Sequence, residues 1–370
     1  MKKIILGIET SCDETGLALV LAYGGLASPK FKILKNLVAS QVKIHEPFGG
    51  VVPNLAKREH LKNLPILFGK IFGNFKYQKT NLKKIHDSPP KADPPPEERL
   101  RIQDVDLISV TVGPGLEPAL WTGITFAKQI ISNLQIPNSK LVGVNHLEGH
   151  LYSFLLPQKS KVQSVNSKAI FPAIALIVSG GHTILLLVKD LKTWKKLGET
   201  RDDAVGEAFD KVARLLKLPY PGGPALEKLA RRGDSGAIDF PRPMIHDKNY
   251  DFSFSGLKTS VLYYLRDNKK YSPQDVAASF QAAAVDVLVK KTLRAVGEFS
   301  AKSVLLSGGV AANRKLRNDM KHEARKLGIQ FLVAEQKYNT DNAVMIAAAG
   351  YMTYLRKKRY PLRANGNLSI

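Results

Sequence analysis

The stretch KIILGIETSCDETGLALVLAY at residues 3–23 consists of two apolar runs separated by a polar turn. Apolar runs of this length, bounded by turn residues, are typical of β-strands, so the stretch predicts a hairpin with strands at 3–9 and 16–23. The same design returns where PAIALIV (172–178) and TILLLVK (183–189) flank the turn SGGH. A hairpin that occurs twice in one chain indicates an internal duplication.

Each hairpin is followed further along the chain by the same two elements. A short apolar run that predicts a buried strand ends in a glycine turn, at 107–112 and again at 303–306. Helical periodicity follows these turns at about 118–134 and 312–327. Two copies of one β-hairpin-plus-βα plan predict an α/β protein with two lobes.

The boundaries of the lobes follow from the repeat. We expect an N-terminal lobe at 1–156 and a C-terminal lobe at 157–370, with the last helix, which begins near Asn342, free to cross back. The polar segment 160–168 is expected to be a linker or loop. Residues 76–104 are rich in proline and in charges of both signs, which predicts a flexible surface insertion that buries little apolar area.

Charge is the main feature of the composition. The chain carries 55 Lys and Arg against 32 Asp and Glu, a formal net charge of +23. Solubility needs far less, so the excess favours a polyanionic partner, first of all nucleic acid. A basic chain without such a partner is the alternative. The signatures of RRM and KH modules are absent, so a nucleic-acid surface would belong to the main fold.

Cysteine content and hydropathy limit the cellular compartments that we expect for this protein. Cys12 is the single cysteine, which excludes a disulfide framework and fits a reducing environment. No apolar run approaches the roughly 18 residues of a membrane span. The short apolar start lacks the small-residue cleavage site of a signal peptide. We therefore expect a cytoplasmic protein without a membrane partner.

Two histidines stand in the run NHLEGH at 145–150. His146 and His150 are about one helical turn apart, so both imidazoles leave one helix face and can bind one metal ion. Glu148 is rotated by about 200° from them and points away, unlike the base of a zinc protease, which adjoins the first histidine. Two ordinary helix histidines are the alternative. Asp341, at a predicted helix start, is a candidate third ligand, with helix capping as its alternative role.

Glycine turns can bring backbone N–H groups against phosphates, although a glycine turn also ends a strand without any ligand. Their equivalent places in two repeats favour a nucleotide or adenylate between the lobes. Asp13 and Glu14, in the first hairpin turn, are candidates to hold a metal or orient a water there, with turn formation as the alternative. The glycine turns are Gly113-Pro114-Gly115, Ser179-Gly180-Gly181-His182, Pro221-Gly222-Gly223-Pro224 and Ser307-Gly308-Gly309-Val310.

Two further polar positions are candidate nucleotide contacts. The run DDAVGEAFDK at 202–211 predicts a helix that Asp202 or Asp203 caps. Asp210 on this helix is either a ribose ligand or an exposed acid. Asn313 follows a glycine turn and is either a helix N-cap or an adenosine contact.

Long motifs stand in order along nearly the whole chain, apart from 76–104 and 157–168. The motifs are GIETSCDET (7–15), VVPNLAKREH (51–60), TVGPGLEPAL (111–120), NHLEGH (145–150), SGGHT (179–183), DDAVGEAFDK (202–211), PGGP (221–224), FSFSGLKT (252–259), SGGVAAN (307–313) and TDNA (340–343). Together they resemble the TsaD family in its bacterial form. The resemblance implies the two-lobed fold of actin, sugar kinases and the Hsp70 ATPase, with duplicated ribonuclease H-like βα lobes and a nucleotide cleft between them.

The same resemblance implies an acyltransferase. Members of the family transfer the threonylcarbamoyl group from threonylcarbamoyl-AMP to N6 of adenosine 37 in tRNAs that read codons starting with A, and they release AMP. We expect direct attack by N6, because neither Cys12 nor any serine stands in a nucleophile motif. The alternatives are an ATP-dependent hydrolase or kinase, a metalloprotease and a non-catalytic nucleic-acid-binding subunit.

Site residues and partners follow from the resemblance too. His146, His150 and Asp341 match the family's ligands for one divalent metal, usually Fe²⁺, with Zn²⁺ as the alternative. Asp13 and Glu14 match acids of its first phosphate-side loop. The implied partners are tRNA, a TsaB-like subunit docked on the N-terminal lobe and a TsaE-like ATPase, with a homodimer left open. The positions that match adenylate contacts are Ile177, Val178, Ser179, Gly180, Gly181, Asp210, Gly223 and Asn313.

Overall fold

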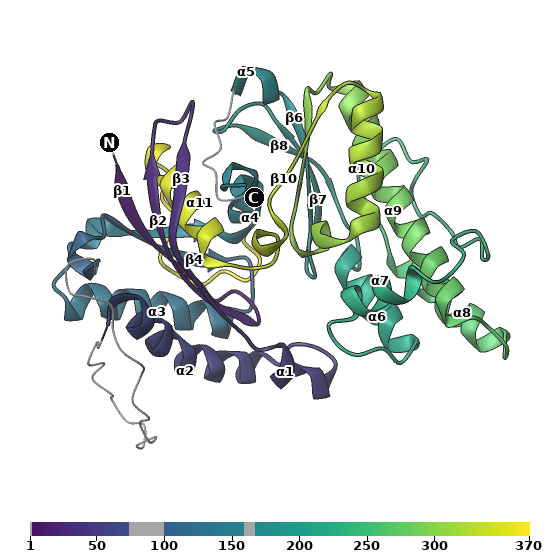
Figure 1. Cartoon of the computed structure of the whole chain (residues 1–370), viewed down its shortest axis with the longest axis horizontal. Helices are drawn as coiled ribbons and strands as arrows, with labels where there is room; N and C mark the ends of the chain where they lie inside the picture. Colours follow the sequence, from purple (N-terminus) through teal and green to yellow (C-terminus); the bar gives the residue numbers. More distant parts are fainter. Residues whose placement is uncertain (1, 74–99, 159–166) are drawn as a thin grey trace.

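The computed structural model of the chain describes residues 2–73, 100–158 and 167–370 (Figure 1). These residues form two five-stranded sheets, one with the strand order β3-β2-β1-β4-β5 and the other with the order β10-β9-β6-β7-β8. The strands of the first sheet are β1 (Lys3–Glu9), β2 (Glu14–Tyr23), β3 (Lys30–Ser40), β4 (Leu107–Gly113) and β5 (Leu141–Asn145). Those of the second are β6 (Ala173–Val178), β7 (Thr183–Val188), β8 (Trp194–Glu199), β9 (Ser303–Ser307) and β10 (Gln330–Val333).

Both sheets follow one plan. In each, the first three strands are antiparallel neighbours, the fourth strand pairs parallel to the first, and the fifth pairs parallel to the fourth. The two predicted hairpins are present as β1–β2 and β6–β7, with Glu9 opposite Gly16 and Val178 opposite Thr183 at their turns. The predicted α/β fold with duplicated ribonuclease H-like lobes is therefore confirmed.

Helices follow the strands in both halves. The first half contains α1 (Val42–His45), η1 (Glu46–Phe48), α2 (Pro53–Phe72), η3 (Ile102–Asp104), α3 (Glu117–Asn133), η4 (Asn138–Lys140), α4 (His146–Tyr152), η5 (Ser153–Leu155) and α5 (Ser167–Ile170). The second contains α6 (Val205–Leu215), α7 (Gly222–Ala230), α8 (Ser255–Asp267), α9 (Pro273–Glu298), η6 (Gly309–Ala312), α10 (Arg314–Lys326), η7 (Gln336–Tyr338) and α11 (Ala343–Leu355). None of the helices in the described ranges is both long and apolar enough to span a membrane.

The last helix returns to the first sheet. Helix α11 lies on the face of that sheet that turns away from α2 and α3, and its buried residues share one core with both sheets (Figure 1). The approach is close, because a Cβ on Gly7 would lie 2.1 Å from the carbonyl oxygen of Ala343. A Cβ on Gly350 would lie 1.8 Å from Oγ of Ser109. Only glycine allows this packing, which brings the start of α11 to the ends of β1 and β5.

The parallel strands of each sheet end at one edge. In the first sheet these ends are Glu9, Gly113 and Asn145, and in the second β6 and β9 end at Val178 and Ser307. Ligands of open α/β sheets bind outside the carboxyl ends of the strands. The histidine pair and three of the four glycine turns therefore follow strand ends of the kind that build binding sites, whereas the turn at 221–224 contains the start of helix α7.

The four strands that the sequence did not predict, β3, β5, β8 and β10, are the edge strands of the two sheets. An edge strand packs on fewer neighbours and tolerates charge, so its apolar pattern is weak. In β3, lysines interrupt the pattern at positions 30, 32 and 35, and β8 is WKKLGE. The central strands, by contrast, are buried along nearly their whole length.

Parts of two further predictions lie outside the described residues. Of the predicted insertion 76–104, the structure describes only the end, where Ile102–Asp104 form a short 3-10 helix. Of the predicted linker 160–168, it describes the last two residues. These begin helix α5 at Ser167 and are therefore helical, not part of a loop.

Candidate metal and adenylate site

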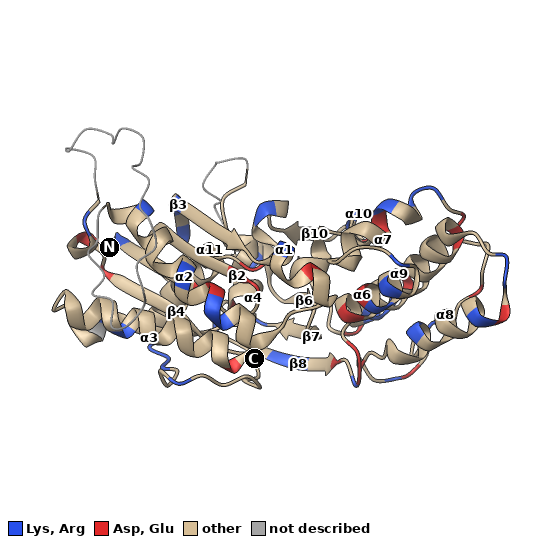
Figure 2. Ribbon diagram, turned by 90° about the horizontal axis from the view of Figure 1, so that it is seen from below, with Lys and Arg blue, Asp and Glu red and all other residues tan. Residues whose placement is uncertain are grey.

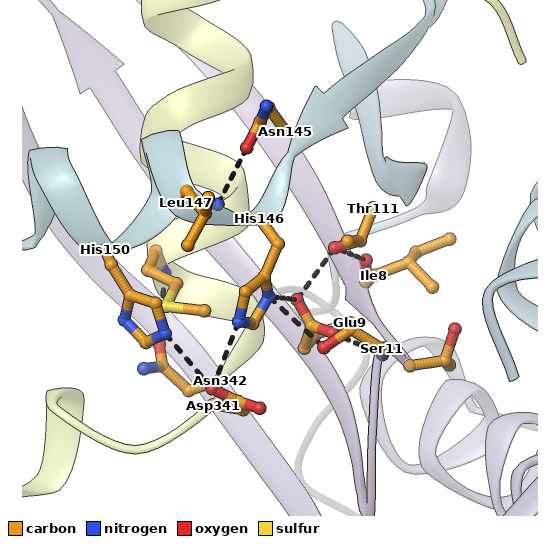
Figure 3. Close-up of polar contacts among 12 residues, drawn as sticks. Ile8, Glu9, Ser11, Thr111, Asn145, His146, Leu147, His150, Asp341 and Asn342 are labelled. Atoms are coloured by element: carbon orange, nitrogen blue, oxygen red, sulfur yellow. Dashed lines mark hydrogen bonds and ion pairs between the residues drawn. The ribbon is translucent and has the colours of Figure 1, made fainter. Parts of the chain in front are cut away.

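Helix α4 begins where strand β5 ends. The Asn145 carboxamide caps it, since its Oδ1 accepts hydrogen bonds from the backbone N–H groups of Leu147 (2.8 Å) and Glu148 (3.4 Å) (Figure 3). A capped start fixes the first turn, so His146 leaves the strand end in a defined direction. His150 follows one turn later on the same face, as the spacing predicted, and both histidines are buried.

The two imidazoles face the carboxylate of Asp341. Its Oδ1 lies 3.4 Å from Nε2 of His146 and 3.3 Å from Nε2 of His150 (Figure 3). These separations are long for hydrogen bonds. They match the edge of a tetrahedron whose ligand atoms lie about 2.1 Å from one ion, which is about 3.4 Å. The three ligand atoms all lie within 4.8 Å of one another, so the donor set fits a divalent transition metal.

Asp341 is not the cap of helix α11. The cap is Asn342, whose Oδ1 accepts from the backbone N–H of Met345 at 3.0 Å. The Asn342 amide also donates to the carbonyl oxygens of Tyr338 and Thr340, which fixes the loop before the helix. The capping role that the sequence left open for Asp341 is therefore wrong, and its carboxylate is free to face the histidines.

A second carboxylate lies behind His146. Oε2 of Glu9 is 3.2 Å from Nδ1 of His146, and Thr111 donates a hydrogen bond of 2.7 Å to the same oxygen (Figure 3). The backbone N–H of Ser11 donates to the other oxygen, Oε1, at 2.5 Å. A carboxylate only accepts, so Nδ1 carries the proton and Nε2 is left as the ligand atom. Glu9 was not among the predicted site residues, although its place at the end of the first strand is typical of one.

Electrostatics distinguish the two histidines. Burial opposes protonation of His146, but the carboxylates of Asp341 and Glu9 outweigh it and raise its pKa to about 10. Burial lowers the pKa of His150, whose Nδ1 has no hydrogen-bond partner in the described structure. Despite burial, the two histidines hold the pKa of Asp341 well below its usual range. A cation bound by the three residues would take the place of one proton, on His146.

The first hairpin turn adds two acids beside this group. Burial, then the charges of Asp13 and Asp341, raise the pKa of Glu14. The same influences raise the pKa of Cys12 well above that of a free thiol, so this cysteine is not a reactive thiolate. Asp13 is almost fully buried. Burial of Tyr220 raises the pKa of this tyrosine, and the nearby charge of Asp13 raises it further, so Asp13 lies near the second half of the chain.

The turn after β6 is held at its base and open at its tip. The backbone N–H of Ser179 donates to the carbonyl oxygen of His182 at 2.8 Å, and Oγ of Ser179 accepts from the N–H of His182 at 3.1 Å. A Cβ built on Gly180 or Gly181 would meet no atom within 4 Å. The residues before the turn, Ile177 and Val178, are buried in strand β6. The turn thus presents two open glycines on a rigid base.

His182 lies both in the glycine turn after β6 and near the metal-ligand histidines. Burial, and then the nearby charges of His146 and His150, lower its pKa to about 4, so it is a neutral imidazole. It also lines a cavity of about 200 Å³ together with Pro114, Leu147 and residues of the C-terminal segment. In the sequence, this histidine stands in a glycine turn without any signal that predicts a role of its own.

The other predicted adenylate contacts have structural partners as well. Oδ1 of Asp210 accepts from the backbone N–H groups of Gly222 (2.8 Å) and Gly223 (3.1 Å) and so holds the start of helix α7. A Cβ on Gly223 would face open space. Asn313 caps helix α10 through Leu316 N–H (3.0 Å), and its amide donates to a buried glutamine. The N-cap alternative for Asn313 is confirmed, while its contact with adenosine stays a prediction.

The prediction that Asp202 or Asp203 caps helix α6 is wrong. The residue before that helix is Ala204, and the structure shows no side-chain cap there. Asp202 instead accepts hydrogen bonds at the start of α8, including 2.8 Å from Phe254 N–H. Asp203 pairs with Lys211 and with Lys258 of α8. Both acids tie α6 to a helix some 50 positions away, which local sequence could not show.

The basic run at the end of α11, residues 356–359, has partners that lie far away in the sequence. A basic run without an acidic neighbour is typical of a solvated helix end or a phosphate contact. In the folded chain, Arg356 and Lys358 pair with the buried carboxylate of Glu148 at 3.3 and 3.0 Å. Glu148 itself points away from the metal-ligand group, as predicted. Only Lys357 and Arg359 of this run are exposed.

Sequence comparisons identify the family to which the chain is similar. Residues 32–86 and 97–348 match the sequence model described as "TsaD: tRNA N6-adenosine threonylcarbamoyltransferase". A tRNA N6-adenosine threonylcarbamoyltransferase of Thermosipho africanus is 46% identical over 353 residues, which cover 95% of this chain and 94% of the relative. One of Bacillus cereus is 42% identical over 369 residues, which cover 98% of this chain and 95% of the relative.

Solved structures support the fold alone. HypF of T. kodakarensis superimposes with a TM-score of 0.56 at 17% sequence identity, over 96% of this chain and 48% of that one. A full-length HypF in a phosphate- and nucleotide-bound form gives a TM-score of 0.54 at 12% identity, over 98% and 47% of the two chains. The two-lobed architecture is therefore shared with proteins of quite different sequence.

Proposed function

The chain belongs to the TsaD family of tRNA N6-adenosine threonylcarbamoyltransferases, and on that premise we propose how its site carries out the transfer. The reaction moves the threonylcarbamoyl group of threonylcarbamoyl-AMP to N6 of adenosine 37 in tRNAs that read codons starting with A. The observation that carries the proposal is the position of Asp341, which follows the second sheet but faces two histidines that follow the first. The relatives do not favour a metalloprotease or an ATP-dependent hydrolase or kinase.

His146, His150 and Asp341 would hold one divalent ion. Two imidazoles and one carboxylate suit Fe²⁺ and also Zn²⁺, and we propose Fe²⁺. When bound, such an ion supplies Lewis-acid stabilisation of negative charge on substrate oxygens. Glu9 orients His146, and both histidines are buried. Glu148, the acid nearest the histidines in the sequence, is not placed to activate water for proteolysis, because it faces the other way and pairs with Lys358.

The adenylate would lie along the second half of the site. The open turn Ile177–Gly181 offers backbone N–H groups at Gly180 and Gly181, where no side chain obstructs a phosphate. Asp210 uses Oδ1 to hold helix α7, which leaves Oδ2 for a ribose hydroxyl next to Gly223. Asn313 is buried, so it would contribute by fixing the residues that line the adenosine site. Each of these residues positions the donor rather than reacting with it.

The chemical step is acyl transfer without a covalent enzyme intermediate. A bond forms between N6 and the carbamoyl carbon, the bond from that carbon to the phosphate oxygen breaks, and AMP leaves with the electron pair. N6 must lose a proton in the process. Asp13 and Glu14 are the proposed acceptors, because both are acids in the first hairpin turn beside Asp341. The high pKa of the Cys12 thiol argues against a covalent route.

The acceptor is tRNA, and the net charge of +23 suits this partner. Lys and Arg residues are spread over helices and strands of both halves rather than gathered on one element (Figure 2). We propose that TsaB-like and TsaE-like subunits assist the reaction and that the protein works in the cytoplasm, where its tRNA substrate is. A homodimer remains an alternative assembly.

Mass spectrometry of tRNA nucleosides tests the proposal. The protein is mixed with threonylcarbamoyl-AMP and tRNA, with and without the two partner subunits, and the threonylcarbamoyl adenosine formed is measured. His146→Ala, His150→Ala and Asp341→Ala should each lower the yield at least about 100-fold. His322→Ala is the matched control, because that histidine is exposed on helix α10. Absence of the modified nucleoside with all components present would refute the proposal.

A further inference from the structure

Glu148 is a buried acid on the helix that carries both histidines. Its side chain is 0% exposed. Its Oε1 accepts hydrogen bonds from Tyr360 Oη at 2.6 Å and from Lys358 Nζ at 3.0 Å, and its Oε2 lies 3.3 Å from Nη1 of Arg356. All three partners come from the segment that follows helix α11. The only acid of α4 is therefore held by residues about 210 positions away.

Aromatic rings enclose these charges. The guanidinium of Arg356 lies 4.5 Å from the ring centroid of Trp194, the first residue of strand β8. Arg356 also donates a hydrogen bond of 2.9 Å to Oη of Tyr152, at the end of α4. The ring of Tyr152 packs edge-on against Trp194 at 6.2 Å. Ion pairs in such a poorly solvated pocket interact strongly, and the loss of one partner leaves a costly unpaired charge.

The same C-terminal segment, residues 356–369, also contacts the start of α4. Nδ2 of Asn145 donates a hydrogen bond of 2.8 Å to the carbonyl oxygen of Ser369, while Oδ1 of the same side chain caps the helix. The segment thus contacts helix α4 at two places. It contacts the first turn through Asn145, and it contacts the face opposite the histidines through Glu148. Helix α11 connects this segment to Asp341, so one helix carries the third ligand at its start and the partners of Glu148 at its end.

We propose that Glu148, held by Arg356, Lys358 and Tyr360, is a positioning residue that sets the rotation of helix α4 and so aims both histidines at Asp341. The inference rests on the proposed metal site. Glu148 lies about 200° around the helix from His146, so a contact there resists rotation about the helix axis. A rotation of only about 20° would move a ligand atom about 6 Å from the axis by roughly 2 Å. Metal ligation tolerates about 0.2 Å.

The proposal also divides the four basic residues 356–359 into two pairs with different roles. Arg356 and Lys358 act inside the protein, whereas Lys357 and Arg359 are exposed. Charge removal at Arg356 should therefore weaken metal binding and leave the salt dependence of tRNA binding unchanged. A phosphate contact at Arg356 would instead flatten that salt dependence by about one counterion. The two origins of an Arg356 effect thus have different signatures.

The test is a Co²⁺ titration of the full chain after metal removal, followed by the visible absorption of the bound ion. We expect Arg356→Gln and Glu148→Gln to raise the Kd for Co²⁺ about 10- to 100-fold and to alter the absorption spectrum, because outer-shell partners tune ligand geometry. Arg359→Gln removes the same charge from an exposed neighbour and should leave both unchanged. Arg242→Gln breaks an ion pair with Asp286 far along the chain and serves as the control for general destabilisation.

Tyr360→Phe covers the case in which the charge variants fail to fold. It removes one hydrogen bond to Glu148 without leaving an unpaired charge, and we expect a several-fold rise in the Kd for Co²⁺. Unchanged Co²⁺ affinity and spectrum in the folded variants would overturn the positioning role while leaving the metal site intact. Absence of Co²⁺ binding by the unaltered protein would instead refute the proposed metal site itself.

Discussion

Glu9 and Asp341 contact opposite nitrogens of one imidazole. Oε2 of Glu9 lies 3.2 Å from Nδ1 of His146, and Oδ1 of Asp341 lies 3.4 Å from Nε2 of the same ring. The two acids come from strand β1 and from the loop before helix α11, more than 330 positions apart in the chain. Glu9 fixes the proton on Nδ1, and Asp341 lies beside Nε2, the nitrogen that is left to bind a metal ion. This relationship leads to a first prediction.

Glu9→Gln should weaken metal binding. The amide introduced by this substitution can present an N–H to Nδ1 of His146 and so favour the tautomer that carries its proton on Nε2, which cannot ligate. We expect the Kd for Co²⁺ to rise about 10- to 100-fold. Glu14→Gln is the control, because it makes the same substitution at another acid near Asp341 that makes no hydrogen bond to His146. Equal effects of the two variants would show that the hydrogen bond between Glu9 and Nδ1 is not the cause.

The stability of the metal-free protein should fall at high pH. Burial lowers the pKa of His146, but Asp341 and Glu9 outweigh it and raise the pKa to about 10, against about 6.5 in an unfolded chain. The proton on His146 therefore stabilises the fold fully below pH 6.5, and this stability is lost as pH rises through about 10. Thermal unfolding of the unaltered protein and of His146→Gln, from pH 6 to 10, should converge at high pH. Parallel curves would contradict the assignment.

Metal removal should lower the melting temperature. An ion that binds only the folded chain stabilises it by about 2.7 kcal/mol when present at about 100 times its Kd. Dialysis against a chelator should abolish this gain, and Fe²⁺ or Co²⁺ should restore it. His146→Ala with His150→Ala is the control, in which the ion should no longer shift the melting temperature. A shift that persists in this double variant would place the ion elsewhere.

Two variants separate the roles of Asp210. Asp210→Ala removes the acceptor for Gly222 and Gly223 N–H and should cost about 1 kcal/mol of unfolding free energy. Asp210→Asn keeps a carbonyl oxygen for these donors, so the protein should remain nearly as stable. If the carboxylate also binds the adenylate ribose, Asp210→Asn will still raise KM for threonylcarbamoyl-AMP. An unchanged KM would reduce Asp210 to a structural role.

Glycine substitutions test the open turn. Gly180→Ala and Gly223→Ala should leave stability unchanged, because the added Cβ meets no atom within 4 Å, but each should weaken adenylate binding. Gly206→Ala is the contrasting variant, since its Cβ would lie 2.5 Å from the carbonyl oxygen of Ser179. It should destabilise the fold and displace the turn. Calorimetry for stability and ligand titration for affinity separate these outcomes. Full adenylate affinity in Gly180→Ala and Gly223→Ala would place the substrate elsewhere.

The local chemistry of the sequence determined the central elements of the fold. Apolar runs around Thr10–Thr15 and around Ser179–His182 specify hairpins, because a strand buried on both faces has no room for polar side chains. The edge strands β3 and β8 carry lysines and lack this signal, so sequence pattern did not reveal them. Histidine spacing likewise set one helix face, since a helical turn has a fixed length.

Tertiary structure decided which residues meet. Asp341 faces the histidines only because α11 returns to the first sheet over Gly7, a packing that no local pattern encodes. The same return brings Arg356 to Glu148 and turns an apparently solvated basic run into the partner of a buried acid. The sequence by itself specified the central strands, the turns and the helix that carries His146 and His150, because these depend on neighbouring residues. Charge pairing and ligand geometry depend on distances across the whole chain, and only the folded structure sets those.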